Sequence, residues 1–116
     1  MHSRGDRIRK TLIKELSDII QHKVKDPRIK GIISVTDVEL SQDYKHAKVY
    51  VSIFGAEEDK ADVMEAIEDS ASFVRGELGK RITIRFTPTV KFLLDESQEK
   101  ARKINDLLDK ISRGEV

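Results

Sequence analysis

The sequence predicts a single α+β domain in which helices pack on one three-stranded sheet. Apolar residues recur every three or four positions between Ile8 and Ile20, the spacing of one face of an amphipathic helix. Residues 47–54 instead alternate between apolar and polar side chains, the period of a half-buried strand. Both periods recur later in the chain without an internal repeat or a linker. The expected order is therefore α-β-β-α-(kink)-α-β-α in one domain.

The first half of the chain predicts a helix followed by a β-hairpin. The amphipathic pattern covers residues 4–24, and Pro27 disfavours helical geometry at Asp26, so the helix ends near there. Two β-rich segments follow, residues 32–40 and residues 47–54, with the polar turn Ser-Gln-Asp-Tyr-Lys between them. This arrangement is typical of an antiparallel hairpin.

The second helical region begins after Gly55, which ends the strand. The acidic run at 57–59 suits the first turn of a helix, because the helix dipole is positive there. An apolar stripe then continues to about Lys80. The triplet Ser70-Ala71-Ser72 lies in its middle, and serine competes for backbone hydrogen bonds, so we expect a bend at these three residues.

A third strand and a last helix are expected in the C-terminal third. Residues 82–86 alternate in polarity, Pro88 interrupts them as a bulge or an edge would, and residues 90–94 resume the alternation. Asp95, with Gln98 three residues later, resembles a capping box. The helix that follows carries one apolar side, formed by Ile104, Leu107, Leu108 and Ile111. We place the domain at residues 1–111 and a short flexible tail at 112–116.

Composition excludes several classes of protein. With 116 residues the chain has one domain's length, and without cysteine it has no disulfide framework, cysteine-ligated zinc or thiol nucleophile. There is no apolar run of membrane-spanning length and no apolar stretch behind a basic N-terminus, so we expect a cytoplasmic location. The three histidines lack metal-ligand spacing, and no catalytic motif is present. We therefore expect no metal, no cofactor and no enzymatic activity.

Charge is segregated along the chain although the net charge is only +1. Residues 1–30 hold nine Lys or Arg against four Asp or Glu, and residues 75–91 hold five against one. Residues 31–74 hold three against ten. Two basic blocks can place a positive face on a nearly neutral protein, which suits a phosphate backbone or an acidic partner.

Three stretches of the sequence resemble the ribosome-binding factor A family of bacterial small-subunit assembly factors. They are residues 26–29 (Asp-Pro-Arg-Ile), residues 35–43 leading into 47–52, and residues 85–97 with the pattern Arg-x-x-Pro-x-Val-x-Phe-x-x-Asp-Glu-Ser. Together with the helix patterns they span nearly the whole chain. The resemblance implies a type II KH-like domain.

That family lacks the Gly-x-x-Gly loop with which ordinary KH domains clamp a nucleic-acid backbone. It has instead an Ala-x-Gly kink followed by an aromatic residue, an aliphatic residue and arginine. Phe73-Val74-Arg75 matches the following triplet, which places the kink on Ser70-Ala71-Ser72. Serine replaces both the alanine and the glycine of the family pattern, which keeps the small size but removes the conformational freedom of glycine.

The resemblance implies a function in late maturation of the small ribosomal subunit. Members bind free 30S subunits and 16S rRNA as monomers, are linked to 16S rRNA end processing and to growth in the cold, and do not cut RNA. Release by an assembly GTPase is also implied. Alternative functions are a protein-binding adaptor or translation-stage regulator on the ribosome, and a small nuclease.

The two basic blocks supply the candidate RNA-binding residues. The first block comprises Arg4, Arg7, Arg9, Lys10, Lys14, Lys23, Lys25, Arg28 and Lys30. The second block comprises Arg75, Lys80, Arg81, Arg85 and Lys91. Lysine and arginine at these positions favour phosphate contacts with salt-dependent affinity. The alternative is an ordinary solvated surface, in which Arg85 pairs with a neighbouring acid across the sheet. We expect Asp26 to cap or turn the chain, with Pro27 fixing its geometry.

The aromatic residues favour recognition of backbone and shape over base stacking. Tyr44 and Tyr50 lie where rings could be exposed, whereas the four phenylalanines are expected in the core, at positions 54, 73, 86 and 92.

Overall fold

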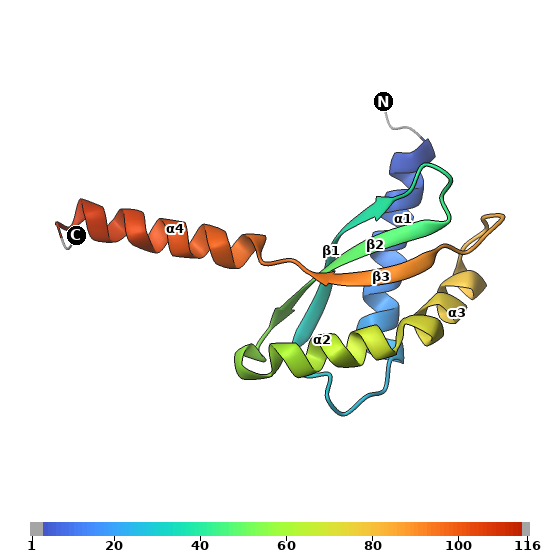
Figure 1. The fold of residues 1–116 in the computed structure, drawn as a ribbon, viewed down its shortest axis with the longest axis horizontal. Helices are drawn as coiled ribbons and strands as arrows, with labels where there is room; N and C mark the ends of the chain where they lie inside the picture. Colours follow the sequence, from blue (N-terminus) through green and yellow to red (C-terminus); the bar gives the residue numbers. More distant parts are fainter. Residues whose placement is uncertain (1–3, 115–116) are drawn as a thin grey trace.

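A three-stranded sheet in the order β1-β2-β3 occupies the middle of the molecule (Figure 1). The computed structural model describes residues 4–114. Along the chain the elements are α1 (Arg4–Asp18), a π-helical turn η1 (Ile19–Lys23), β1 (Ile32–Leu40), β2 (His46–Phe54), a short 3₁₀ helix η2 (Glu57–Asp59), α2 (Lys60–Asp69), α3 (Ala71–Arg81), β3 (Thr89–Leu94) and α4 (Ser97–Ser112). The predicted α+β class and the order of the helices and strands are confirmed.

The strand β2 pairs with a neighbour on each side. It is antiparallel to β1, with Ile32 opposite Phe54 and a bulge between Val35 and Asp37. It is parallel to β3, from the pair His46–Thr89 at its start. A parallel pair needs a long crossover, and α2 and α3 supply it.

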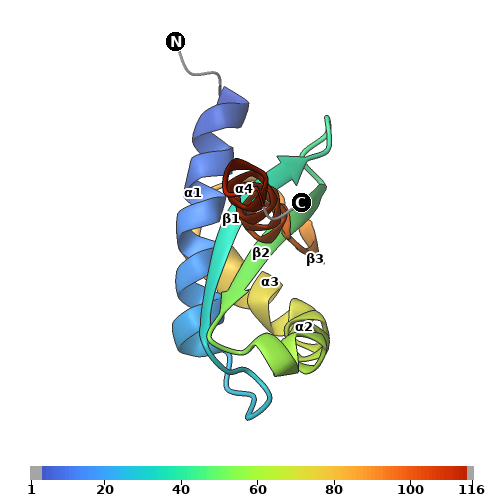
Figure 2. The same ribbon diagram turned by 90° about the vertical axis from the view of Figure 1, so that its left-hand side faces the viewer.

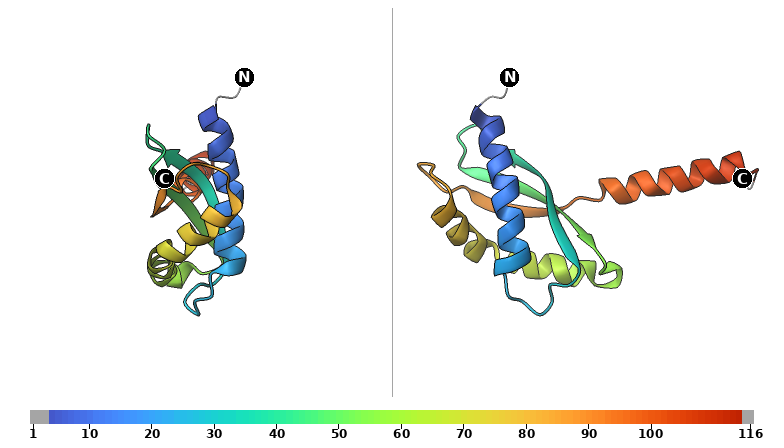
Figure 3. Two further views of the ribbon diagram at one scale, coloured as in Figure 1. Left: turned by 90° about the vertical axis from the view of Figure 1, so that its right-hand side faces the viewer. Right: turned by 180° about the vertical axis from the view of Figure 1, so that it is seen from behind.

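One apolar core joins the sheet to the helices. The inward residues of β2, from Ala47 to Ile53, are buried and meet Leu16 of α1, Val63 of α2 and Leu78 of α3. Figure 2 and the right-hand view of Figure 3 show α1 lying along the sheet. The alternating apolar residues of β2 and the apolar stripe of α1 therefore pack against each other, as their periods predict.

The prediction of a strand at 82–86 is wrong. The structure places residues 82–88 in a loop, and β3 begins only at Thr89. Thr89 pairs with His46, which is the first residue of β2, so the preceding residues have no strand beside them. Pro88 is buried and lacks the N–H that a ladder would require. Alternating polarity alone does not make a strand without a partner.

The helical region breaks at Ser70, between α2 and α3, where the sequence predicts a bend (Figure 1). The Ser70 hydroxyl donates a hydrogen bond of 2.8 Å to the carbonyl oxygen of Ala66, and its backbone N–H also points to that oxygen at 3.1 Å. These bonds satisfy carbonyl groups at the end of α2. The break turns α3 toward β3, against which it packs.

The last helix α4 projects from the sheet and away from the body (Figure 1). Its apolar stripe is exposed: Ile104, Leu107, Leu108 and Ile111. Asp95 fixes the start of the helix, because its carboxylate accepts hydrogen bonds from the Thr36 hydroxyl at 2.6 Å and from the Ser97 N–H at 2.9 Å. Glu96 takes the N-cap position, so the predicted cap is displaced by one residue. Ser112, which was expected in the tail, is the last residue of α4. Residues 115–116 of the predicted tail lie outside the described chain.

Among residues 4–114, no helix combines the length and the apolar character needed to cross a membrane.

Replacing Gly31 by alanine is expected to destabilise the fold. Gly31 has a φ of +78°, and a Cβ there would lie 2.1 Å from the carbonyl oxygen of Phe54. Gly55 has a similar φ of +83°, but a Cβ there would meet only the Gly31 Cα at 3.8 Å. We expect Gly55→Ala to lower the free energy of unfolding by about 1–2 kcal/mol, and Gly31→Ala to lower it by at least about twice as much. Urea denaturation followed by circular dichroism measures both, and equal losses would contradict the clash.

Acid is expected to destabilise the fold below about pH 4. The pKa of each of Asp18, Asp26, Asp43 and Asp95 lies below the ordinary 3.8, mainly because each carboxylate accepts a side-chain hydrogen bond. A lowered pKa in the folded state contributes stability above the unfolded pKa and loses it as the pH falls through the folded value. The urea midpoint should therefore fall as the pH drops below about 4.

Asp95→Asn should make that acid dependence shallower, because it removes the carboxylate that Thr36 holds in its charged form. Asp106→Asn, at an exposed position of α4, is the matched control and should leave the pH profile unchanged. The same profile in all three proteins would rule out the Thr36–Asp95 contact as its source.

Candidate nucleic-acid interface

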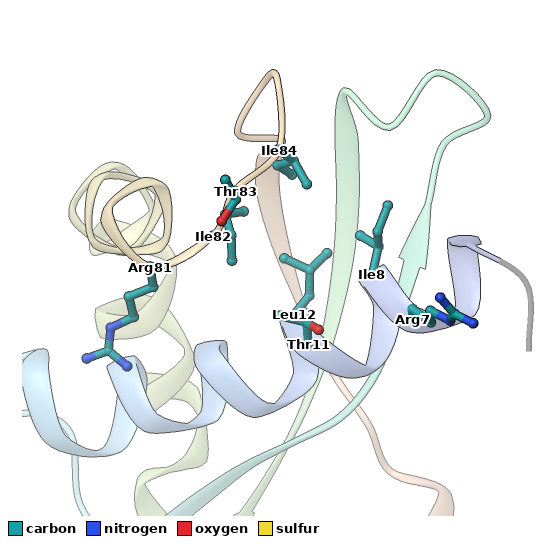
Figure 4. Close-up of a pocket in the computed structure, with 8 residues that line it drawn as sticks. All are labelled: Arg7, Ile8, Thr11, Leu12, Arg81, Ile82, Thr83 and Ile84. Atoms are coloured by element: carbon teal, nitrogen blue, oxygen red, sulfur yellow. The ribbon is translucent and has the colours of Figure 1, made fainter.

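A shallow hollow of about 260 Å³ separates α1 from residues 82–84. Figure 4 shows its lining: an apolar floor of isoleucines and Leu12, two threonines, and an arginine at either end, Arg7 and Arg81. Both arginines were predicted as RNA contacts. Their surroundings differ, because Arg7 has no carboxylate partner among the described residues whereas Arg81 has two.

Arg81 ties the end of α3 to α1. Its guanidinium lies 2.6 Å from the Asp18 carboxylate and 3.2 Å from that of Glu15, and the side chain is only 22% exposed. The hydrogen bond between Arg81 and Asp18 lowers the pKa of Asp18 and raises that of Arg81. This arginine therefore stabilises the packing of two helices, and its charge is already compensated within the chain.

Arg28 is compensated in the same way. Its guanidinium contacts Asp26 at 2.7 Å and Asp69 at 3.0 Å, which joins the loop after η1 to the last residue of α2. The hydrogen bonds from Arg28 lower the pKa of Asp26, and those carboxylates raise the pKa of Arg28. The Asp26 carboxylate also accepts a hydrogen bond of 2.9 Å from the Arg28 backbone N–H, which is consistent with the turn expected of Asp26.

Three further candidates have carboxylate partners. Arg9 lies 2.7 Å from Asp37, Lys80 lies 3.2 Å from Glu77, and Lys30 lies 3.7 Å from Asp59. These pairs are largely exposed, where ion pairs contribute little stability. They nevertheless reduce the positive charge available to an outside phosphate.

Other candidates are exposed and have no carboxylate partner among the side chains that the structure describes, residues 4–97 and 100–114: Arg4, Arg7, Lys14, Lys25, Arg85 and Lys91. Lys23 is also exposed, and its charge helps to lower the pKa of Asp18. Lys10 is exposed on the same helix as Arg7. The structure thus divides the predicted set into cations that hold the fold and cations that face solvent. The second group lies on α1, in the segment after it, and around the 82–88 loop and β3.

Arg75 organises the 82–88 loop. Its Nε and Nη2 donate hydrogen bonds to the carbonyl oxygen of Thr87 at 3.2 and 2.9 Å. A second open hollow, of about 520 Å³, lies between α3 and this loop. Its lining comprises Ser72, Arg75, Gly76, Gly79, Arg85, Phe86 and Thr87. The 82–88 loop therefore stands between two hollows, one facing α1 and one facing α3.

The expectation of four core phenylalanines is wrong for three of them. Phe92 is buried, but Phe54, Phe73 and Phe86 are 44%, 48% and 57% exposed. Phe86 is exposed because the 82–88 segment has no strand partner to turn its ring inward. Polarity alternation was the only sequence signal there, and it misassigned this residue. Sequence reasoning therefore missed Phe86 as a functional candidate.

The two tyrosines are half-buried rather than fully exposed. Tyr44 occupies the hairpin turn with a φ of +58°. Burial, together with the nearby Glu39 carboxylate, raises the pKa of Tyr50. Among the described residues, no group of three or more His, Cys, Asp or Glu is placed to hold a metal ion.

The sequence matches proteins of one family along nearly its full length. The sequence profile of ribosome-binding factor A matches residues 4–108. Ribosome-binding factor A of Caldanaerobacter subterraneus subsp. tengcongensis is 43% identical over 115 residues, which cover 99% of this chain and 94% of that protein. The factor from Halothermothrix orenii is 46% identical over 112 residues, covering 97% and 91%.

Solved structures agree with the sequence matches. The crystal structure of ribosome-binding factor A from Thermus thermophilus superposes with a TM-score of 0.65 at 28% identity, covering 76% of this chain and 91% of that one. A second Thermus thermophilus structure, with a TM-score of 0.62 at 28% identity and the same coverage, is a homology model fitted into a cryo-EM map of a 30S complex of the factor. The fold is KH-like, and the chain belongs to the ribosome-binding factor A family.

Proposed function

We propose that this chain binds the free 30S subunit through 16S rRNA and assists its late maturation, including 16S rRNA end processing. The observation that carries the proposal is the relative of the same fold placed in a complex with the 30S subunit. The unpaired cations support it: Arg7 lies at one end of the hollow in Figure 4, and Arg85 is exposed on the 82–88 loop. A ribosomal RNA backbone supplies the matching negative charge.

The mechanism is binding without chemistry. By contacting one arrangement of the rRNA better than its competitors, the factor shifts the population toward that arrangement. It acts as a monomer in the cytoplasm, where free subunits mature, and neither needs a cofactor nor cuts RNA. Release by an assembly GTPase and a larger requirement in the cold, where misfolded rRNA escapes more slowly, belong to the same proposal.

Co-sedimentation through sucrose gradients tests the partner. The protein is mixed with free 30S subunits or with assembled 70S ribosomes, each at low and at moderate salt. We expect co-migration with free subunits only, and its loss as the salt concentration rises. Equal binding to 70S ribosomes would instead identify a translation-stage regulator, and absence of binding to both would refute the proposal.

Charge reversal at the solvent-facing cations should weaken 30S binding and its salt dependence together. Arg7→Glu and Arg85→Glu remove one phosphate contact each, so each should lower the slope of log affinity against log salt by about one. Lys103→Glu on the projecting helix α4 is the matched control and should leave the slope unchanged. Unchanged slopes in the first two variants would exclude these arginines from the interface.

Arg81→Gln should reduce the stability of the fold and leave the salt dependence of 30S binding unchanged. Because Arg81 holds Asp18 and Glu15, its loss should lower the thermal unfolding temperature while the salt slope of 30S binding stays at the wild-type value. Measuring binding well below the unfolding temperature separates the two effects. A reduced salt slope in the folded variant would show that Arg81 does contact RNA.

A further inference from the structure

The hollow between α3 and the 82–88 loop presents an exposed aromatic ring beside a guanidinium. Phe86 is 57% exposed, although burying a phenylalanine ordinarily stabilises a fold. The Cζ of Arg85 lies 5.4 Å from the centre of the Phe86 ring, within the range of a cation–π contact. Both side chains line the same hollow.

Two glycines of α3, Gly76 and Gly79, line this hollow and have different surroundings. At Gly76 a Cβ would meet no atom within 4 Å, so the space in front of it is empty. At Gly79 a Cβ would approach the Thr87 hydroxyl to 3.0 Å, so the loop lies close against the helix there. Gly76 therefore leaves room within the hollow of about 520 Å³, and Gly79 allows the loop to approach α3.

The loop that carries Phe86 is anchored on the C-terminal side of the ring. Arg75 donates two hydrogen bonds to the Thr87 carbonyl, and the next residue, Pro88, is buried. Thr89 then enters the sheet opposite His46. The backbone that follows the ring is therefore anchored, so a ligand would have less of the loop to order.

Arg85 covers one face of the Phe86 ring, and the other face, next to that positive charge, suits a flat, anionic ligand. Single-stranded nucleic acid has both properties, because each unpaired base offers a face for stacking and each phosphate offers a negative charge. A duplex does not, because its bases are already stacked on one another. Arg85 has no carboxylate partner in the described part of the chain, so its charge is available.

We propose that this hollow binds one unpaired nucleotide of RNA, with the base stacked on Phe86 and the phosphate beside Arg85. The inference rests on the proposed function and deepens it: the factor reads an unpaired segment of rRNA at this point, in addition to its phosphate contacts. It also replaces the expectation that base stacking is minor.

Phe86→Trp tests the stacking directly, because the chain contains no other tryptophan. Titration with a single-stranded RNA octamer should quench the tryptophan fluorescence, whereas an RNA duplex of equal length and inorganic phosphate should not. Phe54→Trp is the matched control, since Phe54 is 44% exposed and lines a hollow with three carboxylates, at Glu57, Asp95 and Glu96, against two cations, Lys60 and Arg102. Quenching in neither variant, or equal quenching in both, would overturn the proposal.

Phe86→Ala should weaken binding of the same labelled octamer by roughly tenfold in fluorescence anisotropy, whereas Phe86→Tyr should restore it because the ring is kept. Duplex binding and the unfolding temperature should be unchanged in both variants, since the ring is exposed. Wild-type affinity for the octamer in Phe86→Ala would refute the stacking site even if 30S co-sedimentation succeeded. Octamer binding without 30S binding would refute the proposed function while keeping the site.

Discussion

The extent of β2 is the constraint on which the rest of the structure depends. This strand pairs with both neighbours, and its core-facing residues Val49 and Val51 are fully buried. Because β2 begins at His46, the parallel strand beside it can begin only at Thr89. The pairing between β2 and β3 ends at Val51 and Leu94. The next residue, Asp95, still donates its N–H to the Val51 carbonyl at 2.7 Å, and the chain leaves the sheet after it. The length of one ladder thus determines both the free 82–88 loop and the point from which α4 projects.

Strand positions follow from the sequence wherever the backbone has a neighbouring strand to pair with. Residues 32–40 were predicted as a strand and form β1 with those bounds, because their pattern matches a neighbour along its whole length. Residues 82–86 have the same alternation and no neighbour, so they form a loop. A sequence pattern records which side chains favour burial, but only the register of β2 decides which backbone groups find hydrogen-bond partners.

The sequence predicted which residues of the candidate site are cationic. It did not predict which of these cations pair with carboxylates inside the fold and which face solvent. The sequence shows which residues are cationic, and the structure shows which of those charges the fold itself uses. Arg28 and Arg81 pair with carboxylates far away in sequence, at Asp69 and Asp18, which no local spacing reveals. Arg7 and Arg85 keep their charge for solvent because no carboxylate in the described chain pairs with them. The net charge of +1 therefore conceals a surface whose local charge is set by these pairings.

The kink explains how the chain tolerates serine where the family pattern has glycine and alanine. Ser72, which stands at the glycine of the family pattern, lies inside α3, and among the described non-glycine residues only Tyr44 has a positive φ. Ser70, which stands at the alanine, is the residue at the break, with φ and ψ of −88° and 1°. No positive φ is required, so losing the freedom of glycine does not prevent the bend. The Ser70 hydroxyl instead bonds the Ala66 carbonyl and ends α2. The bend in turn directs Arg75 toward Thr87, so the same break that separates the two helices also positions the loop that holds Phe86.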